Sequence, residues 1–153
     1  MDYRELAFYQ KAREVTRGIH LEINSWSHDT QAKAVVGQLF RAATSVGANI
    51  AEGHGRHEGS EYIHYLYIAQ GSANEVDHWL HTALDCQIGN STNIQRLILL
   101  NNETRKMLAA TIHSLQSKRA SKSLKEPSLP YSPAPISPIP YSPDENDEGA
   151  TNE

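Results

Sequence analysis

The distribution of proline constrains this chain more than any other feature of its sequence. All seven prolines lie at or beyond Pro127, so the whole preceding stretch lacks a residue that breaks helices. That stretch is also rich in Ala, Leu, Glu, Gln and Arg, which favour helix formation. We therefore expect an all-helical domain, followed by a separate segment rich in proline.

Apolar residues recur at intervals of three and four along four segments, at about 3–24, 30–52, 60–88 and 93–117. The second segment shows the pattern most regularly, with Ala32, Val36, Leu39, Ala43, Val46 and Ile50. Such spacing is typical of helices that pack along one another at a shallow angle. Short joints make neighbouring helices antiparallel, so we predict an all-α, up-down-up-down four-helix bundle over residues 1–120.

The joints carry residues that start and stop helices. Residues 27–30, Ser-His-Asp-Thr, offer N-cap side chains, and residues 92–95, Thr-Asn-Ile-Gln, fit a capping box. Gly53 and Gly89 are predicted to end the second and third helices. The single cysteine, Cys86, excludes an intramolecular disulfide and a cysteine-built metal site, and we expect its thiol to be mostly buried.

The first turns of the third segment are apolar around the whole helix. The residues concerned are Tyr62, Ile63, Tyr65, Leu66, Tyr67 and Ile68. A helix that is apolar all round is buried all round, yet one face should meet water in a bundle of four. We therefore expect another copy of the chain to cover this face, which makes the protein a homo-oligomer.

The charge divides the chain into two parts. Residues 1–125 hold all 14 Lys and Arg and 12 of the 18 acidic residues, a net charge of +2. Residues 126–153 hold the other six acids, and Ser-Pro recurs there at 132, 137 and 142. We predict that residues 121–153 form a disordered tail, basic at its start and then Pro-rich and acidic. With no signal peptide and no apolar run of about 18 residues, we expect a soluble cytoplasmic protein that binds no membrane.

A specific signature runs across the second and third segments. It consists of residues 38–53, QLFRAATSVGANIAEG, then Arg56, then residues 61–75, EYIHYLYIAQGSANE. Over roughly residues 3–117 the chain resembles the four-helix-bundle proteins named for the 23S rRNA intervening sequence. That family includes the accessory variability proteins of diversity-generating retroelements. The resemblance implies a ring-shaped homopentamer with no known catalytic activity, and its retroelement members bind nucleic acid and assist a reverse transcriptase.

The positions that match the family are Ser45, Asn49, Glu52, Gly53, Arg56, Gly71, Ser72 and Glu75. We interpret them as structural. Asn49 and Glu52 fall near the end of a helix, where they can bond to loop backbone, and Arg56 can pair with Glu52.

Several chemistries are disfavoured by spacing. The glycines at 53, 55 and 59 follow a predicted helix and not a strand, so they do not form a dinucleotide-binding loop. Two E-x-x-H units, Glu61 to His64 and Glu75 to His78, lie on one helix about 21 Å apart, too far to share a pair of metal ions. No arrangement of a nucleophilic triad is evident. We predict no enzyme activity, no catalytic residue, no metal and no cofactor.

Two functional hypotheses remain open. The first is binding of RNA or cDNA, beside a reverse transcriptase in the retroelement branch, through basic residues on the first helix and after the fourth. These residues are Arg13 and Arg17, with His20 on the same strip, and Lys118, Arg119, Lys122 and Lys125. The second is a protein-interaction scaffold that presents the Pro-rich tail. For one chain alone such basic residues are typical of ordinary solvated helix faces, but the family resemblance favours nucleic-acid binding, and a symmetric ring would multiply each basic patch.

Overall fold

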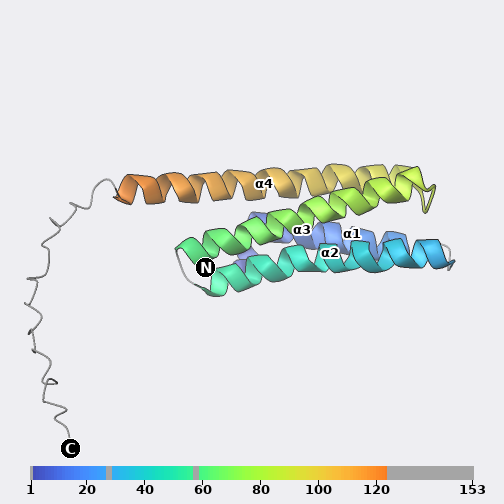
Figure 1. The fold of residues 1–153 in the computed structure, drawn as a ribbon, viewed down its shortest axis with the longest axis horizontal. Coiled ribbons are helices and arrows are strands. Elements are labelled where there is room, and N and C mark those ends of the chain that lie inside the picture. Colours follow the sequence, from blue (N-terminus) through green and yellow to red (C-terminus); the bar gives the residue numbers. More distant parts are fainter. Residues whose placement is uncertain (1, 27–28, 57–58, 124–153) are drawn as a thin grey trace, which may run out of the picture.

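Four long α-helices form the structure. A computed structural model describes residues 2–26, 29–56 and 59–123. A short 3₁₀-helix, η1 (Tyr3–Glu5), precedes α1 (Ala7–Ile23), α2 (Thr30–Gly55), α3 (Ser60–Asp85) and α4 (Ser91–Ser123). The α-helices lie lengthwise side by side, and no strand occurs in these residues, so the all-α prediction is confirmed (Figure 1).

The helices form a ring in chain order. α1 packs beside α2 and α4, and α3 packs beside the same two helices, whereas the diagonal pairs have no Cα atoms within 8 Å of one another in the described ranges. Two cross-links show the direction of α1 against α4. Lys11 pairs with Glu103 at 3.1 Å, while Glu22 accepts a hydrogen bond from Asn93 at 2.9 Å. Residue numbers rise along α1 as they fall along α4, so the helices are antiparallel and the predicted up-down-up-down bundle is confirmed.

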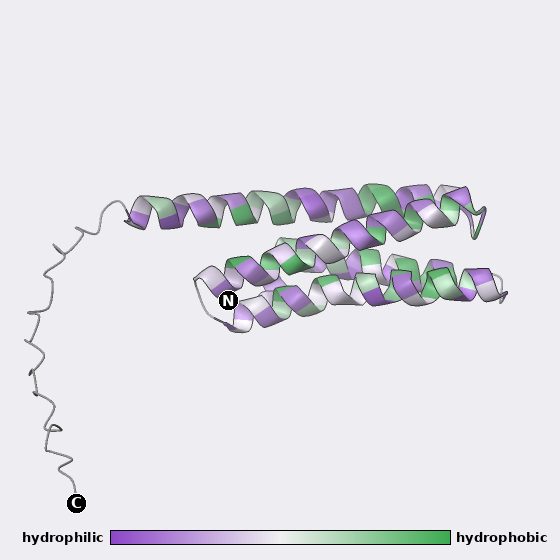
Figure 2. Cartoon of the chain, in the orientation of Figure 1, coloured by the Kyte–Doolittle hydropathy of each residue, from purple (hydrophilic) through white to green (hydrophobic). Residues whose placement is uncertain are grey.

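The predicted seams form the core. Leu39 and Ile50 on α2, Leu66 and Leu80 on α3, and Ile19 on α1 have no exposed surface. Burying a large aliphatic side chain contributes about 1.5–3 kcal/mol, so this column of residues supplies much of the favourable free energy of folding. Polar and apolar residues alternate around the helices, and the apolar stripes meet inside the bundle (Figure 2).

The helix starts follow the predicted chemistry at one joint and depart from it at another. Asp29 caps α2, as expected for residues 27–30, because its side chain accepts a hydrogen bond of 2.8 Å from the N–H of Ala32. The capping box predicted at residues 92–95 is wrong. Instead the side chain of Asn90 accepts a 3.0 Å bond from the N–H of Asn93, and α4 begins at Ser91.

Gly53 does not end the second helix, which corrects the sequence-based prediction. α2 continues to Gly55, and Gly53 is buried against α3. A Cβ atom at this position would lie 2.7 Å from the Cβ of Tyr65 and 3.2 Å from Cδ2 of Tyr62. The absence of a side chain therefore lets α2 and α3 approach closely. Gly89 has a left-handed φ of +80°, but it does not end the third helix as predicted, because α3 stops at Asp85 and the left-handed residue that follows it is Gln87, with a φ of 58°.

The ends of two other helices also differ from expectation. Residues 3–5 form the 3₁₀-helix capped by Asp2, and the first α-helix starts only at Ala7. α3 stops at Asp85, earlier than predicted. Cys86 therefore lies beyond the last helical turn and is exposed, so the prediction of a mostly buried thiol is wrong.

α4 is longer than its neighbours and projects past the end of the bundle (Figure 1). Within the described residues, the last hydrogen bond from α4 to another helix is the 2.9 Å bond from the side-chain amide of Gln116 to the hydroxyl of Tyr67. Residues 117–122 are exposed, and the helix runs to Ser123 through the predicted domain boundary at 120. We call residues 117–123 the α4 overhang. The rest of the predicted tail, 124–153, lies outside the described residues.

A buried carboxylate ties α1 to the α3–α4 joint. Glu22 is only 6% exposed, and its Oε1 accepts hydrogen bonds from Nε1 of Trp26 at 3.1 Å and from the N–H of Asn90 at 2.8 Å. Its Oε2 accepts from the side-chain amide of Asn93 at 2.9 Å. A side chain at Gly89 would collide with the Trp26 ring. Three neutral donors thus satisfy this acid, as a buried charged group requires.

Candidate nucleic-acid interface

Arg13 and Arg17 lie one turn apart on the exposed side of α1. Neither makes an ion pair with a carboxylate among the residues that the structure describes. Lys11 on the same helix behaves differently, because its ammonium group bonds to Glu14 at 3.0 Å and to Glu103 at 3.1 Å. These bonds raise the pKa of Lys11 above its usual value. The two arginines therefore keep their positive charge available for an external anion.

Tyr9, Arg13, Arg17 and His20 of α1 face α2 across an open groove of about 460 Å³. The α2 side of the groove contains an aromatic ring and small or hydroxylated residues, namely Phe40, Thr44, Gly47 and Ala48. Thr16 on α1 completes it. No acidic residue contributes to this lining, so the groove carries a net positive charge. We call it the α1–α2 groove.

The threonine hydroxyls of the α1–α2 groove are already committed as donors. Thr16 donates to the carbonyl of Ala43 or Ala12, each at 3.0 Å, and Thr44 donates to the carbonyl of Phe40 or Arg41, again at 3.0 Å. A hydroxyl has one hydrogen, so these groups have only acceptor capacity left. A phosphate needs donors, and in this groove the guanidinium groups supply them.

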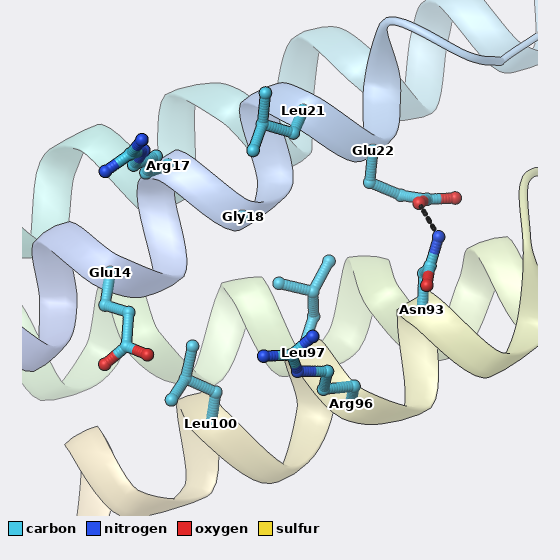
Figure 3. A pocket seen from close by; sticks show the side chains of 9 residues that line it. All are labelled: Glu14, Arg17, Gly18, Leu21, Glu22, Asn93, Arg96, Leu97 and Leu100. Atoms are coloured by element: carbon cyan, nitrogen blue, oxygen red, sulfur yellow. Dashed lines mark hydrogen bonds between the residues drawn. The ribbon is translucent and has the colours of Figure 1, made fainter.

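A second pocket opens between α1 and α4, and its charges cancel (Figure 3). Arg17 and Arg96 line it together with Glu14 and Glu22. Two arginines beside two carboxylates leave no net charge to attract a polyanion. The α1–α2 groove is therefore the stronger candidate for phosphate binding, and Arg17 lies at the edge shared by both.

The basic block predicted after the fourth helix falls on the α4 overhang. Its described members, Lys118, Arg119 and Lys122, are all exposed, and none makes an ion pair with a described residue. The fourth predicted residue, Lys125, lies outside the described residues. The overhang thus presents cations on an exposed helical segment.

The structure does not join the two predicted basic groups into one patch. Glu103 lies level with Lys11, at 3.1 Å, and Lys118 follows Glu103 by 15 residues along α4. At 1.5 Å per residue this separates Lys118 from the level of Lys11 by about 22 Å along the helix axis. Arg13 lies further in the opposite direction. One subunit therefore has two distinct basic surfaces.

The charged signature residues form ion pairs between or within helices. Arg56 pairs with Glu52 at 2.6 Å, as expected, and this hydrogen bond raises the pKa of the guanidinium. Glu75 on α3 bonds to Arg41 on α2 at 2.7 Å. Both pairs are largely exposed, where an ion pair contributes at most about 1 kcal/mol. They neutralise their arginines, which leaves these positions poorly suited to bind phosphate.

The small polar signature residues bond to the backbone of their own helices. Asn49 donates to the carbonyl of Ser45 at 2.8 Å and not to loop backbone as predicted. Ser45 donates to Arg41 at 2.8 Å, and Ser72 donates to Ile68 at 3.1 Å. These contacts agree with a structural interpretation. Gly71 is exposed, and a Cβ there would meet nothing within 4 Å.

Phe40 is the groove residue that sequence reasoning missed. It lies one position after the core residue Leu39, and its side chain is 37% exposed. The signal was present in the sequence, because a phenylalanine off the apolar seam of an amphipathic helix has to face outward. As for metal binding, no group of three or more His, Cys, Asp or Glu residues in the described ranges could hold a metal ion.

The fold and surface define a class, a four-helix bundle with an acid-free basic groove between its first two helices. Residues 4–110 match the family of the 23S rRNA-intervening sequence protein, and the chain belongs to that family. The family resemblance predicted from the signature is thereby confirmed. A search of the curated proteins found no match.

The fold is also seen in a solved structure of another protein. It is described as a protein with unknown function from the S23 ribosomal protein family of Bacteroides thetaiotaomicron VPI-5482. It is 25% identical to this chain, with a TM-score of 0.60, and the alignment covers 69% of this chain and 98% of that one. None of the described helices is apolar over a length that could cross a membrane.

Proposed function

We propose that this chain is a non-enzymatic, homo-oligomeric protein that binds RNA or cDNA through the α1–α2 groove. The observation that carries this proposal is the pair Arg13 and Arg17, which lack acidic partners in the described structure and flank a groove without a carboxylate. Guanidinium groups bind phosphate through paired N–H donors, and phosphate contacts supply most of the affinity for nucleic acid.

The oligomeric part of the proposal is supported by α3. Tyr67 is 46% exposed and Ile68 is 39% exposed, although both belong to the apolar first turns of this helix. Gly71 lies one turn further along, and no atom of the described residues lies within 4 Å of the position that a Cβ would take there. Exposed apolar side chains beside a small residue favour a contact with another helix. A pentameric ring and a reverse-transcriptase partner stay predictions from the family resemblance.

The proposal is tested by binding of a fluorescein-labelled RNA of mixed sequence, measured by anisotropy at low salt. Arg13→Ala combined with Arg17→Ala should weaken binding by roughly tenfold or more, because two charge-assisted phosphate contacts are lost. Lys33→Ala combined with Lys106→Ala is the matched control. It removes the same charge from exposed residues that do not line the groove.

The control variant should keep its affinity within about a factor of two, since only a general charge effect remains. Equal loss in both variants would contradict a specific groove. No binding by the parent protein would remove the nucleic-acid proposal, and salt-insensitive capture of a protein through the tail would favour the scaffold hypothesis instead.

A further inference from the structure

Phe40 occupies an exposed position that core packing does not explain. Its neighbour Leu39 is completely buried, whereas the ring of Phe40 is 37% exposed on the wall of the α1–α2 groove. Its described ring partner is His20 of α1, with ring centroids 6.0 Å apart and planes inclined by 47°. The groove thus presents an aromatic surface that is partly supported and partly open to a ligand.

The charges next to this ring indicate which class of ligand fits the groove. Arg13 and Arg17 lie on the facing helix, one turn apart, with no described acidic partner. An apolar peptide would leave both guanidinium groups without counter-charge. A second copy of the same groove would bring like charges together, which disfavours a self-contact here. A polyanion with flat apolar groups satisfies both the cations and the ring.

We infer that the α1–α2 groove binds single-stranded nucleic acid, with a base stacked on Phe40 and the adjacent phosphates held by Arg13 and Arg17. This inference rests on the proposed function and specifies the substrate class of that site. In a duplex the base faces are stacked on one another and cannot reach an aromatic side chain, whereas unpaired bases can be splayed onto one. Only single strands can therefore gain binding free energy by stacking a base on Phe40.

The groove has a second aromatic end. Tyr9 lies 11 residues before His20 on α1, about 16 Å away along the helix, and its ring packs edge-on against Tyr3 at 4.9 Å. Arg13 and Arg17 fall between these two aromatic ends. The groove thus offers cations for phosphates and aromatic rings for bases along one strand, whichever sugar the strand contains.

The test measures the affinity of the full-length protein for a single-stranded RNA, for the duplex of that RNA and for a single-stranded DNA of the same sequence. Phe40→Ala should weaken single-strand binding roughly five- to hundredfold, which is the range for loss of one stacked base, and should leave duplex affinity unchanged. Phe40→Trp should retain single-strand affinity because it keeps a stacking surface. Leu99→Ala removes an even more exposed apolar side chain elsewhere, on α4, and should change neither affinity.

The outcomes separate this inference from the proposed function. One contrary outcome is that the arginine variants lose binding while Phe40→Ala lowers the affinities for single strand and duplex equally, or lowers neither affinity. In either case the groove binds phosphate without stacking, and the inference is overturned. If Phe40→Ala changes the oligomeric mass in light scattering and not RNA affinity, the ring belongs to a contact between chains, which also overturns it. Absence of any RNA binding by the parent removes the proposed function itself.

Discussion

The carboxylate of Glu22 on α1 accepts a 2.9 Å hydrogen bond from the side-chain amide of Asn93 on α4. The same carboxylate accepts from Trp26 and from the backbone of Asn90, so one acid joins a helix, a joint and a second helix. If the acid is removed, the N–H of buried Trp26 is left without a partner, which costs about 1–3 kcal/mol, whereas Asn90 and Asn93 are exposed and can bond to water instead.

Glu22→Ala should therefore lower the free energy of unfolding by about 1–3 kcal/mol in urea denaturation. Glu22→Gln should lower it by less than about 1 kcal/mol. The glutamine oxygen keeps the two bonds at Oε1, and Asn93 can turn its amide so that its own oxygen faces the new NH₂ group. Equal losses in the two variants would show that the negative charge, and not the pattern of donors and acceptors, holds this joint.

Gly53→Ala should destabilise the bundle by about 1–3 kcal/mol, because the added Cβ would lie 2.7 Å from the Cβ of Tyr65 and force α2 away from α3. Gly37→Ala is the matched control on the same helix. Nothing lies within 4 Å of its Cβ position, so it should raise stability by up to about 1 kcal/mol through helix propensity. Thermal unfolding of both variants checks the pair, and destabilisation by Gly37→Ala as large as that by Gly53→Ala would contradict the close approach.

The bundle could be predicted from the sequence because it results from a periodic pattern of apolar residues. Positions such as Leu39 and Leu66 repeat every three or four residues, and burial follows directly from that repeat. Gly53 was predicted to end a helix, since a glycine near the end of an amphipathic segment looks the same whether it turns the chain or admits a neighbouring helix. Glu22 was not predicted to be buried, because acids are rarely buried and its three donors converge only in three dimensions.

The candidate site was predictable only in part. Arg13 and Arg17 could be chosen from sequence as a basic strip, but their lack of partners depends on where every acid of the neighbouring helices falls. The sequence shows Arg13 and Arg17 and the cations of the α4 overhang as two groups, but it does not tell how far apart they lie in the fold. The antiparallel register separates them, and periodicity within each helix contains no information about that register.

Oligomerisation should be visible by light scattering as a mass well above the 17.0 kDa of one chain. Ile68→Lys should shift the protein toward monomer, because a charge replaces an apolar side chain that is 39% exposed on α3. Leu99→Lys changes a residue that is 67% exposed on α4 and should leave the mass unaffected. A parent protein that scatters as a monomer at micromolar concentration would contradict the proposed assembly.

The acidic end of the chain should compete with nucleic acid for the α4 overhang. Removing residues 127–153 deletes five of the six acids beyond residue 125 and should tighten RNA binding at low salt, with a gain that shrinks as salt rises. A full-length variant with those acids changed to Asn or Gln should show the same gain. Changing Lys118, Arg119 and Lys122 to Ala should weaken binding and abolish the gain. If the neutralised tail has no effect, the tail does not mask the overhang.

The most direct test of the central claim is the salt dependence of the association constant for a single-stranded RNA. Each phosphate contact on a single strand adds roughly −0.7 to the slope of log K against log salt concentration. Two arginines in the α1–α2 groove predict a slope of about −1.4 or steeper for the parent protein. In the variant with Arg13→Ala and Arg17→Ala, the slope should be shallower by about 1.4 units. A parent slope near zero, or an unchanged slope in that variant, would contradict the account.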